Sequence, residues 1–258
     1  MEIKFYKYQG TGNDFIMINN MNKELSFTKS TISRLCDRKF GIGADGLILI
    51  EPDVNTDFYV NYYNSDGSQS FCGNGSRCSV AFAHSEDIFR GPTCTFNAID
   101  GLHTGEILPN LEVQVSMGDV NGLEKSNNDF VLNTGSPHYV VFCNALTDLD
   151  LISEAKKIRY HSRFFDEGIN VNFVERIGNA LKIRTYERGV EDETLSCGTG
   201  VTAAAVSSVL DDGTHNVKLE TLGGELRVSF IKKNHIFSSI KLQGAANFVF
   251  FGEVKLEK

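Results

Sequence analysis

CGNGSRCSVAFAH (residues 72–84) and CGTGVTAAAVSSVL (residues 197–210) repeat one pattern: a cysteine, a glycine turn, and then a run rich in small and apolar residues. The two cysteines stand 125 positions apart (197 − 72). A polar loop followed by a glycine turn and such a run is typical of the start of a helix. We therefore expect each turn to open a helix, with Cys72 and Cys197 at the two N-termini.

Two further motif pairs keep the same order and almost the same interval. Gly43-x-Asp45 matches Gly168-x-Asn170 at 125 positions (168 − 43), and Thr11-Gly12-Asn13 matches Thr134-Gly135-Ser136 at 123 positions (134 − 11). Ordered repetition at a near-constant interval indicates an internal duplication. The sequence therefore predicts two pseudo-symmetric domains: residues 1–117, completed by a C-terminal strand at 248–258, and residues 118–247.

Strand patterns outnumber helical patterns in both halves. Helical patterns cover residues 28–40 after the capping candidate Ser26, 74–84, 150–159 and 199–210. Strand-like alternation bounded by turn residues occurs at residues 3–8, 15–19, 46–50, 58–63, 111–116, 130–132, 139–142, 171–175, 181–186, 217–220, 226–230 and 248–251. The fold class predicted is α/β, in the sense of a β-rich α+β chain.

Composition excludes several classes of protein. The 258 residues carry 25 Lys and Arg against 33 Asp and Glu, a net charge of −8, and 41% are hydrophobic. This is a globular, acidic chain, which argues against nucleic acid or anionic lipid as its partner and favours a small molecule. No apolar stretch approaches the roughly 18 residues of a membrane span, and the N-terminus MEIKFYKYQG does not resemble a signal peptide. We expect a cytoplasmic protein with no membrane partner.

The six cysteines should be mostly thiols in a reducing cytoplasm. We interpret Cys36, Cys78, Cys94 and Cys143 as core residues, because each lies within a predicted helix or strand pattern. No close Cys-x-x-Cys pair is present, so no metal site is predicted.

Cys72 and Cys197 suggest acid/base chemistry. A helix N-terminus favours thiolate over thiol, and the same backbone N–H groups bind a carboxylate. Inversion of a stereocentre beside a carboxylate needs a base on one face and an acid on the other, and two tuned thiols supply both. No P-loop, dinucleotide fingerprint or recognisable pyridoxal phosphate lysine occurs, so the reaction is expected to need no cofactor. The alternative is that both cysteines are buried small residues at helix starts.

Polar residues in the neighbouring loops complete a candidate pocket. Asn13, Asn64, Asn170 and the pair Glu187-Arg188 supply hydrogen-bond donors and acceptors for an amino acid with a second polar end. Asparagine is also common in turns for its own backbone contacts, and Glu187-Arg188 is equally consistent with a solvated pair. His138 is either a satisfied core histidine or a neighbour of one thiol.

Six ordered motifs resemble the diaminopimelate epimerases over nearly the whole chain: GTGNDFI at 10–16, GIGADGL at 41–47, NSDGSQSFCGNGSRC at 64–78, SPH at 136–138, GINVNFV at 168–174 and YERGVEDETLSCGTG at 186–200. The resemblance implies two domains, each a curved mixed sheet wrapped around a central helix, with the active site in the interdomain cleft. It implies an isomerase that interconverts LL- and meso-2,6-diaminopimelate without pyridoxal phosphate, for lysine and peptidoglycan precursor biosynthesis, usually as a homodimer.

The same resemblance assigns roles to single residues. It makes Cys72 and Cys197 the acid/base pair, and it makes His138 and Glu187 the groups that tune their pKa values. The residues that it implies hold substrate are Asn13, Asn64, Gly73, Asn74, Asn170, Glu187, Arg188, Gly198 and Thr199. Ser136 stands where many members have a substrate-contacting asparagine, which shortens or removes one contact. The 64–72 segment is one residue shorter than in those members, and the loop before Cys197 one residue longer.

Two other functions stay open on the sequence. A proline or hydroxyproline racemase resembles this chain in its paired Cys-Gly turns, but its substrate lacks a distal zwitterion. A non-catalytic binding protein with a redox-switch disulfide would use the same two thiols differently.

Overall fold

The computed structural model describes residues 2–256, so Met1 and the last two residues of the predicted 248–258 segment lie outside the description. The chain divides into two compact units. Unit 1 comprises Met1–Val115 and Gly244–Lys258, and unit 2 comprises Ser116–Gln243. Each unit contains a mixed sheet and a central helix.

The strands of unit 1 follow one another in the sheet in the order β18, β1, β2, β3, β4, β5, β6, β7. The pairs β2–β3 and β4–β5 are parallel, and the others are antiparallel. The bounds of these strands are β1 (Glu2–Gly10), β2 (Asn13–Asn19), β3 (Gly46–Glu51), β4 (Phe58–Asn64), β5 (Thr93–Ala98), β6 (Gly101–Ile107), β7 (Val113–Ser116) and β18 (Asn247–Lys255).

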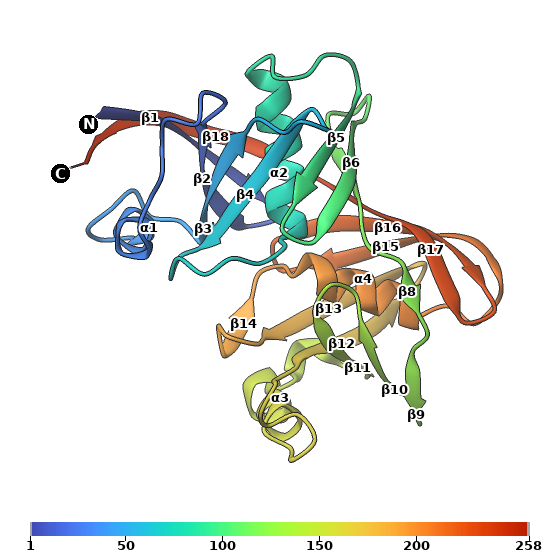
Figure 1. Cartoon of the computed structure of the whole chain (residues 1–258). Coiled ribbons are helices and arrows are strands. Elements are labelled where there is room, and N and C mark those ends of the chain that lie inside the picture. The colour runs from blue at the N-terminus through green and yellow to red at the C-terminus, as the bar shows by residue number, and fades with distance from the viewer. Residues whose placement is uncertain (1, 257–258) are drawn as a thin grey trace. The chain divides into compact units, whose positions relative to one another are not determined.

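Helix α2 (Gly73–Ser85) is the centre of unit 1. It contacts β1, β2, β3, β4, β6 and β18, and in Figure 1 the blue and green strands of the unit lie around it. Its first ten residues are nearly all buried because the sheet covers it on several sides. The small residues of the sequence pattern allow this close packing.

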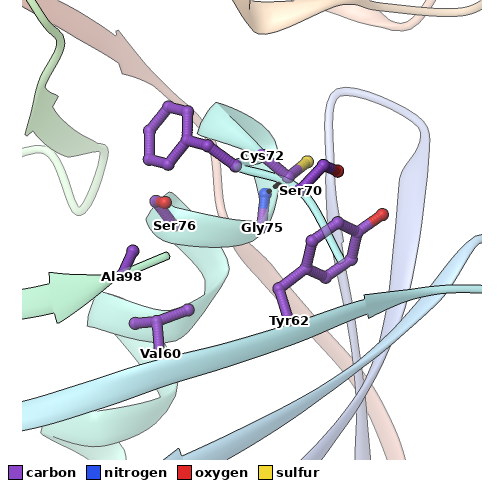
Figure 2. A pocket seen from close by; sticks show the side chains of 8 residues that line it. Val60, Tyr62, Ser70, Cys72, Gly75, Ser76 and Ala98 are labelled. Atoms are coloured by element: carbon purple, nitrogen blue, oxygen red, sulfur yellow. Dashed lines mark hydrogen bonds between the residues drawn. The ribbon is translucent and has the colours of Figure 1, made fainter. Parts of the chain in front are cut away.

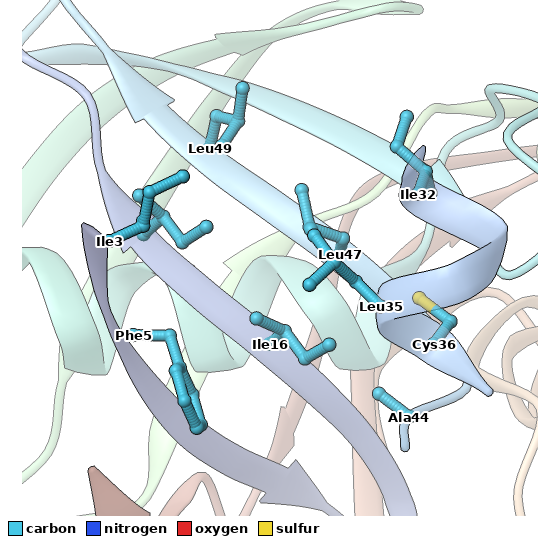
Figure 3. Packing of buried hydrophobic residues seen from close by; sticks show 10 residues of the cluster. Ile3, Phe5, Ile16, Ile32, Leu35, Cys36, Ala44, Leu47 and Leu49 are labelled. Carbon is cyan, nitrogen blue, oxygen red and sulfur yellow. The ribbon is translucent and has the colours of Figure 1, made fainter. Parts of the chain in front are cut away.

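A second, shorter helix covers the other face of the sheet. Helix α1 (Lys29–Cys36) packs Ile32 and Leu35 against Leu47 and Leu49 of β3, as Figure 3 shows. Successive side chains of a strand point to opposite faces. Leu47 and Leu49 therefore face α1, whereas Ile48 faces α2 and lies beside Gly75. Strand β3 reads as a continuous apolar run because both of its faces are covered.

Unit 2 repeats this arrangement with a different set of elements. Its strands pair as β9–β10–β11–β12–β13, then β13–β15–β16, with β11–β12 and β13–β15 parallel. Helix α4 (Gly198–Ser207) contacts β10, β11, β12, β13, β15 and β16, and α3 (Leu151–Arg159) packs on the opposite face against Val171 and Phe173. The remaining bounds are β8 (Val120–Asn121), β9 (Glu124–Ser126), β10 (Asp129–Asn133), β11 (Pro137–Phe142), η1 (Leu146–Asp148), β12 (Asn170–Ile177), β13 (Ala180–Glu187), β14 (Asp192–Thr194), β15 (Gly213–Thr221), β16 (Gly224–Lys233) and β17 (Ile236–Gly244).

The strand register corrects one of the motif pairings. Phe15 lies opposite Gly46 in the parallel pair of unit 1, and His138 lies opposite Asn170 in that of unit 2. Since the Thr-Gly turns before β2 and β11 are equivalent, Phe15 corresponds to His138 and Gly46 to Asn170. The sequence matched Asn170 with Asp45 instead, because the loop that follows Gly168 is one residue shorter than the loop that follows Gly43.

The four predicted helices are confirmed, but the first and the fourth end earlier than their patterns, α1 at Cys36 and α4 at Ser207. Helix α1 is capped by Thr28, whose hydroxyl accepts the N–H of Thr31, and not by Ser26. It ends at Cys36 because the carboxylate of Asp37 accepts the next N–H groups, those of Lys39 and Phe40, in a turn.

The predicted strands fall within observed strands except at residues 111–116, where β7 begins only at Val113 because Leu111, at a φ of +65°, belongs to the preceding turn. Several observed strands have no clear pattern. Strands β8, β9 and β14 are only two or three residues long, and β6 is interrupted by Gly105. In β17, Ser239 adopts a φ of +52°, which shifts the buried side from Phe237 to Ile240 and hides the alternation. Within residues 2–256, no helix is long and apolar enough to cross a membrane.

Candidate active site

Cys72 caps helix α2. Its backbone is extended (φ −134°, ψ 109°), and its sulfur accepts the N–H of Gly75 at 3.3 Å, the contact drawn in Figure 2. The thiol donates to Oδ1 of Asn13 at 3.7 Å. Cys72 is half-buried, while Gly73, Asn74 and Gly75 are buried. A helix start of this kind stabilises negative charge, either on the sulfur or on a bound carboxylate.

The amide of Asn13 is oriented by a charged network. Its Nδ2 donates to Asp45 at 2.7 Å, which turns its Oδ1 toward the Cys72 sulfur and toward Asn74 Nδ2 at 3.4 Å. Arg38 joins Asp45 to Asp14, with contacts of 2.7 Å to each. The carboxylate of Asp45 thus holds an acceptor in place beside the cysteine.

Asp14 lies at the centre of that network. Its carboxylate pairs with Lys7 at 2.7 Å and with both terminal nitrogens of Arg38. Burial acts to raise the pKa of Asp14, but the hydrogen bonds and charges of Arg38 and Lys7 outweigh it and lower the pKa to about 2. The carboxylate is therefore ionised at any pH near neutrality.

A buried guanidinium follows Cys72 on the same helix. Arg77 is fully buried, and its Nη2 donates to Thr11 Oγ1 at 3.2 Å. Within residues 2–256, its Nε and Nη1 have no hydrogen-bond partner. Burial lowers the pKa of Arg77, and electrostatic interactions with Cys78, Cys72 and Glu112 act in the opposite direction. Because arginine stays protonated in proteins, a buried positive charge interacts with Cys72.

A pocket opens beside Cys72. In Figure 2 the hydroxyls of Tyr62 and Ser70 lie on the same side as the Cys72 sulfur. Tyr62 donates to Asn64 Oδ1 at 2.9 Å, and Asn64 Nδ2 donates to Ser68 and Ser70. The lining residues are Val60, Tyr62, Ser70, Phe71, Cys72, Gly75, Ser76 and Ala98.

Gly46 leaves room for the Tyr62 ring. A Cβ atom at Gly46 would lie 2.4 Å from Tyr62 Cε2 and 2.6 Å from the carbonyl oxygen of Tyr63. Neither distance is compatible with a side chain. Glycine at residue 46 therefore allows the Tyr62 ring and strand β4 to approach β3 this closely. Asn64 of β4 lies opposite Gly46.

Cys197 caps helix α4 in a more enclosed setting. Its backbone is again extended (φ −118°, ψ 111°), and the residue is 8% exposed. Its sulfur lies 3.4 Å from Oγ1 of Thr199. The hydroxyl of Thr134 donates to the carbonyl of Thr199 at 2.8 Å, which fixes the turn from the strand side.

His138 reaches this turn through Thr199. Its Nε2 lies 2.9 Å from Thr199 Oγ1, and its Nδ1 lies 3.0 Å from Nδ2 of Asn172. Burial, and then the positive charge of Arg188, lowers the pKa of His138 to about 3. The imidazole is therefore neutral, and it contacts a residue beside the thiol.

The remaining predicted residues of unit 2 form a second group. Asn170 Nδ2 donates to Ser136 Oγ at 2.9 Å, and Asn170 Oδ1 accepts the backbone N–H of Arg188 at 2.9 Å. Gly168, at a φ of +73°, leaves room for the Arg188 side chain, which a Cβ atom would meet at 2.6 Å. Glu187 ends β13, and its role in tuning a cysteine stays a prediction.

The structure thus brings the predicted residues together in separate groups. Asn13, Cys72 and Asn74 form one, His138, Thr199 and Cys197 another. Ser136, Asn170 and Arg188 form the third, while Asn64 is bonded to Tyr62, Ser68 and Ser70. Sequence reasoning missed Asp45, Arg77, Tyr62 and Asn172. Asn172 lies two residues after Asn170 in the quoted GINVNF, and this period of two was the signal that both face the same side.

The other four cysteines lie apart from this chemistry. Cys36, Cys78 and Cys94 are buried, and burial raises the pKa of each to about 12. Cys143 is only half-buried, less than its predicted core position implies, and burial again raises its pKa. Within residues 2–256, no group of three or more His, Cys, Asp or Glu side chains is placed to hold a metal ion.

Comparison with known proteins identifies the family. The family model described as diaminopimelate epimerase matches residues 5–123 and 130–249. The "Diaminopimelate epimerase" of Flavobacterium psychrophilum is 51% identical over 253 residues, covering 96% of this chain and 98% of that protein.

Solved structures agree on the fold. A PhzF-family phenazine biosynthesis protein from Bacillus anthracis has a TM-score of 0.74 at 13% identity, covering 99% of this chain and 100% of that one. A hydroxyproline epimerase from Agrobacterium vitis, with bound trans-4-OH-L-proline, has a TM-score of 0.71 at 12% identity, covering 100% and 93%. The two matched segments, the duplicated cysteine turns and the identity over nearly the whole length lead to one conclusion: the chain belongs to the diaminopimelate epimerase family.

Proposed function

We propose that this chain is a cofactor-independent epimerase that interconverts LL- and meso-2,6-diaminopimelate, with Cys72 and Cys197 as its acid/base pair. The observation that carries the proposal is the equivalent placement of the two cysteines, each at the N-terminus of the central helix of its unit. A helix start stabilises a thiolate, and two such thiols are what a two-base inversion needs.

The proton balance of the reaction follows from two thiols. One cysteine, as thiolate, takes the α-proton, so that a C–H bond breaks and an S–H bond forms. The carbanion that results is stabilised by its carboxylate, which accepts N–H groups of a helix start. The other cysteine, as thiol, then gives its proton to the opposite face of the same carbon. After one turnover the two sulfurs have exchanged protonation states, and the reverse reaction starts from there.

Substrate recognition is proposed for the residues grouped around the two helix starts. Gly73, Asn74, Gly198 and Thr199 supply the groups for the reacting carboxylate, and Asn13, Asn64, Asn170, Glu187 and Arg188 bind the rest of the substrate. Among residues 2–256, the guanidinium of Arg188 makes one hydrogen bond, to the carbonyl of Glu167 at 2.9 Å. Its other N–H groups suit the distal carboxylate of a diamino dicarboxylic acid.

A homodimer in the bacterial cytoplasm, serving lysine and peptidoglycan precursor synthesis, is part of the same proposal. Strand β18 supports self-association, because Phe248, Val249, Phe250 and Phe251 are consecutive and 45–64% exposed. Adjacent positions on a strand point to opposite faces, so apolar surface is presented on both. Light scattering after size exclusion would give twice the chain mass, and Phe251→Glu would reduce it.

Proton NMR in D₂O tests the activity directly. The reduced protein is mixed with LL-diaminopimelate, L-proline or L-hydroxyproline, each alone and without added cofactor. We expect the α-proton signal to disappear only with diaminopimelate, with deuterium first in the inverted product. Exchange with proline or hydroxyproline would assign a racemase instead, and no exchange with any of the three would contradict an epimerase and favour a binding or redox role.

A further inference from the structure

Asn172, a residue without a role in the proposed reaction, has a fixed amide orientation. It lies on β12 and is fully buried. Its Nδ2 lies 3.1 Å from the carbonyl oxygen of Tyr139, an acceptor that only a nitrogen can satisfy. Its Oδ1 accepts the hydroxyl of Thr185 at 3.0 Å. The partners therefore decide which end of the amide is nitrogen and which is oxygen.

This orientation sets the tautomer of His138. The same Nδ2 group of Asn172 faces Nδ1 of the ring at 3.0 Å, so Nδ1 is an acceptor and carries no hydrogen. A neutral imidazole then carries its hydrogen on Nε2. That nitrogen lies 2.9 Å from Thr199 Oγ1, and it donates to the hydroxyl oxygen.

This series of hydrogen bonds extends to the Cys197 sulfur. Thr199 Oγ1 accepts from His138, and its own hydrogen is left to point at Cys197 Sγ, 3.4 Å away. Hydrogen bonds aligned in one direction polarise one another, and a bond to an ionised acceptor is stronger than a neutral one. Every donor in the series Thr185, Asn172, His138, Thr199 therefore points toward Cys197.

We infer that Asn172 is a positioning residue for the proposed reaction: by fixing the tautomer of His138, it directs the Thr199 hydroxyl hydrogen to the Cys197 sulfur and stabilises the thiolate. The inference rests on the proposed function for its purpose, but the hydrogen-bond chain can be tested without substrate. Asn172 touches neither the thiol nor a reacting atom, so it acts through His138 and Thr199.

Unit 1 supplies an internal control for this chain. The register places Phe15 where unit 2 has His138, and Ile48, two residues after Gly46, where unit 2 has Asn172. Both apolar side chains lie beside Gly75, as Asn172 lies beside Gly200. The same architecture is therefore built with apolar side chains at the two positions equivalent to His138 and Asn172. Burying polar groups costs free energy, and unit 1 shows that the fold does not need them at these positions. This indicates that His138 and Asn172 serve the Cys197 sulfur.

Gly200, the last residue of the second Cys-Gly-x-Gly turn, supports the same conclusion. A Cβ atom there would lie 2.4 Å from Asn172 Oδ1. At Gly75 the nearest atom would be the end of the flexible Ile48 side chain, at 3.1 Å. The turn of unit 2 is thus fitted closely to the amide.

The test is the thiolate absorbance of Cys197 near 240 nm as a function of pH. It is measured in a Cys72→Ser protein and corrected with the Cys72→Ser/Cys197→Ser protein, so that the other four thiols cancel. Asn172→Ile introduces the residue that unit 1 carries at the equivalent position. We expect the titration midpoint to rise by about one pH unit, a tenfold loss of thiolate at neutral pH.

Thr199 variants distinguish a directed chain from a packing effect. Thr199→Val should raise the midpoint as much as Asn172→Ile, Thr199→Ser should restore it, and Asn172→Ile should have no further effect once Thr199 is Val. The midpoint of Cys72, measured in a Cys197→Ser protein, should not move with Asn172→Ile.

Three results would overturn the inference. The first is an unchanged Cys197 midpoint in folded Asn172→Ile, and the second is an additive shift when Asn172→Ile and Thr199→Val are combined. The third is an unchanged Cys197 midpoint in Thr199→Val, and this variant also decides the question if Asn172→Ile does not fold. None depends on turnover. If the hydrogen-bond chain is confirmed but the protein does not exchange the α-proton of diaminopimelate, only the proposed function is contradicted.

Discussion

The two helix starts stabilise negative charge by different means. Behind Cys72 lies a charged environment, with the buried guanidinium of Arg77 below and Asp45, linked to Arg38, holding Asn13 beside the sulfur. Behind Cys197 lies a neutral series of hydrogen bonds. Five residues after each cysteine, unit 1 has Arg77 and unit 2 has Thr202, whose hydroxyl donates to the helix carbonyl of Gly198.

This difference shows which part of the duplicated pattern the fold needs. The cysteine cap, the two glycines and the small helix residues occur in both units, whereas the source of stabilisation differs. A reaction in which one sulfur is a thiolate while the other is a thiol does not require equal environments.

Cys72→Ser and Cys197→Ser are the severest test of the comparison. Serine keeps the shape of cysteine but is far more weakly acidic. We therefore expect turnover to fall by about 10²–10⁴-fold, both from LL to meso and from meso to LL, because removal of one general acid or base has effects of this size. Calorimetric titration with diaminopimelate should still detect binding. If either variant kept its turnover, the two units would not share the chemistry.

Acid should destabilise unit 1 before unit 2. The pKa of Asp14 is lowered to about 2 from 3.8, so the stabilisation is complete above pH 4 and is lost as pH falls toward 2. The shift corresponds to about 2 kcal/mol, or roughly 30-fold in the unfolding equilibrium. The equivalent position in unit 2 is Pro137, which has no carboxylate. Hydrogen exchange of peptides from each unit between pH 4 and 2 measures this, and equal loss of protection would contradict it.

Arg77→Met should separate stability from activity. Removing the buried cation should raise the pH midpoint of Cys72 thiolate formation by about one pH unit. Because about tenfold less thiolate is then present at neutral pH, kcat/KM should be about tenfold lower. Because burial of the guanidinium is costly, the melting temperature should not fall.

Thr202→Val is the matched control for Arg77→Met at the equivalent position of α4, and it should leave the Cys197 midpoint unchanged. A Cys72 midpoint that stays the same in Arg77→Met would show that the guanidinium serves packing alone.

Asp45→Ala tests the other half of the charged environment. Without the carboxylate, Asn13 loses the partner that orients its amide, and the rate of alkylation of Cys72 by iodoacetamide at pH 7 should change by about two- to fivefold, the effect of one hydrogen bond. The half-buried position of Cys72 makes the measurement possible. Cys197 titration should be unaffected, and an equal effect on both cysteines would point to general unfolding.

The sequence predicted the repeated parts of the molecule better than the parts that differ. The helix starts at Cys72 and Cys197 follow from residue types that have one main structural use, and the alternation of β2, β3, β11 and β12 follows from burial. Asp45, Arg77 and Asn172 could not be assigned because their roles depend on partners far along the chain, as Asn172 does on Tyr139 and Thr185. The one-residue error in matching Asp45 with Asn170 arose because loop length is invisible in a short motif.

Gly46 constrains how this family can diverge. Because a methyl group at that position would collide with both the Tyr62 ring and the backbone of β4, a new side chain cannot be acquired by one substitution without displacing Asn64. Residue 46 should therefore remain glycine among relatives whatever residue occupies position 62, because a smaller side chain at 62 would not remove the contact with the carbonyl oxygen of Tyr63. An engineer who wishes to widen the pocket beside Cys72 can replace Tyr62 but must keep Gly46.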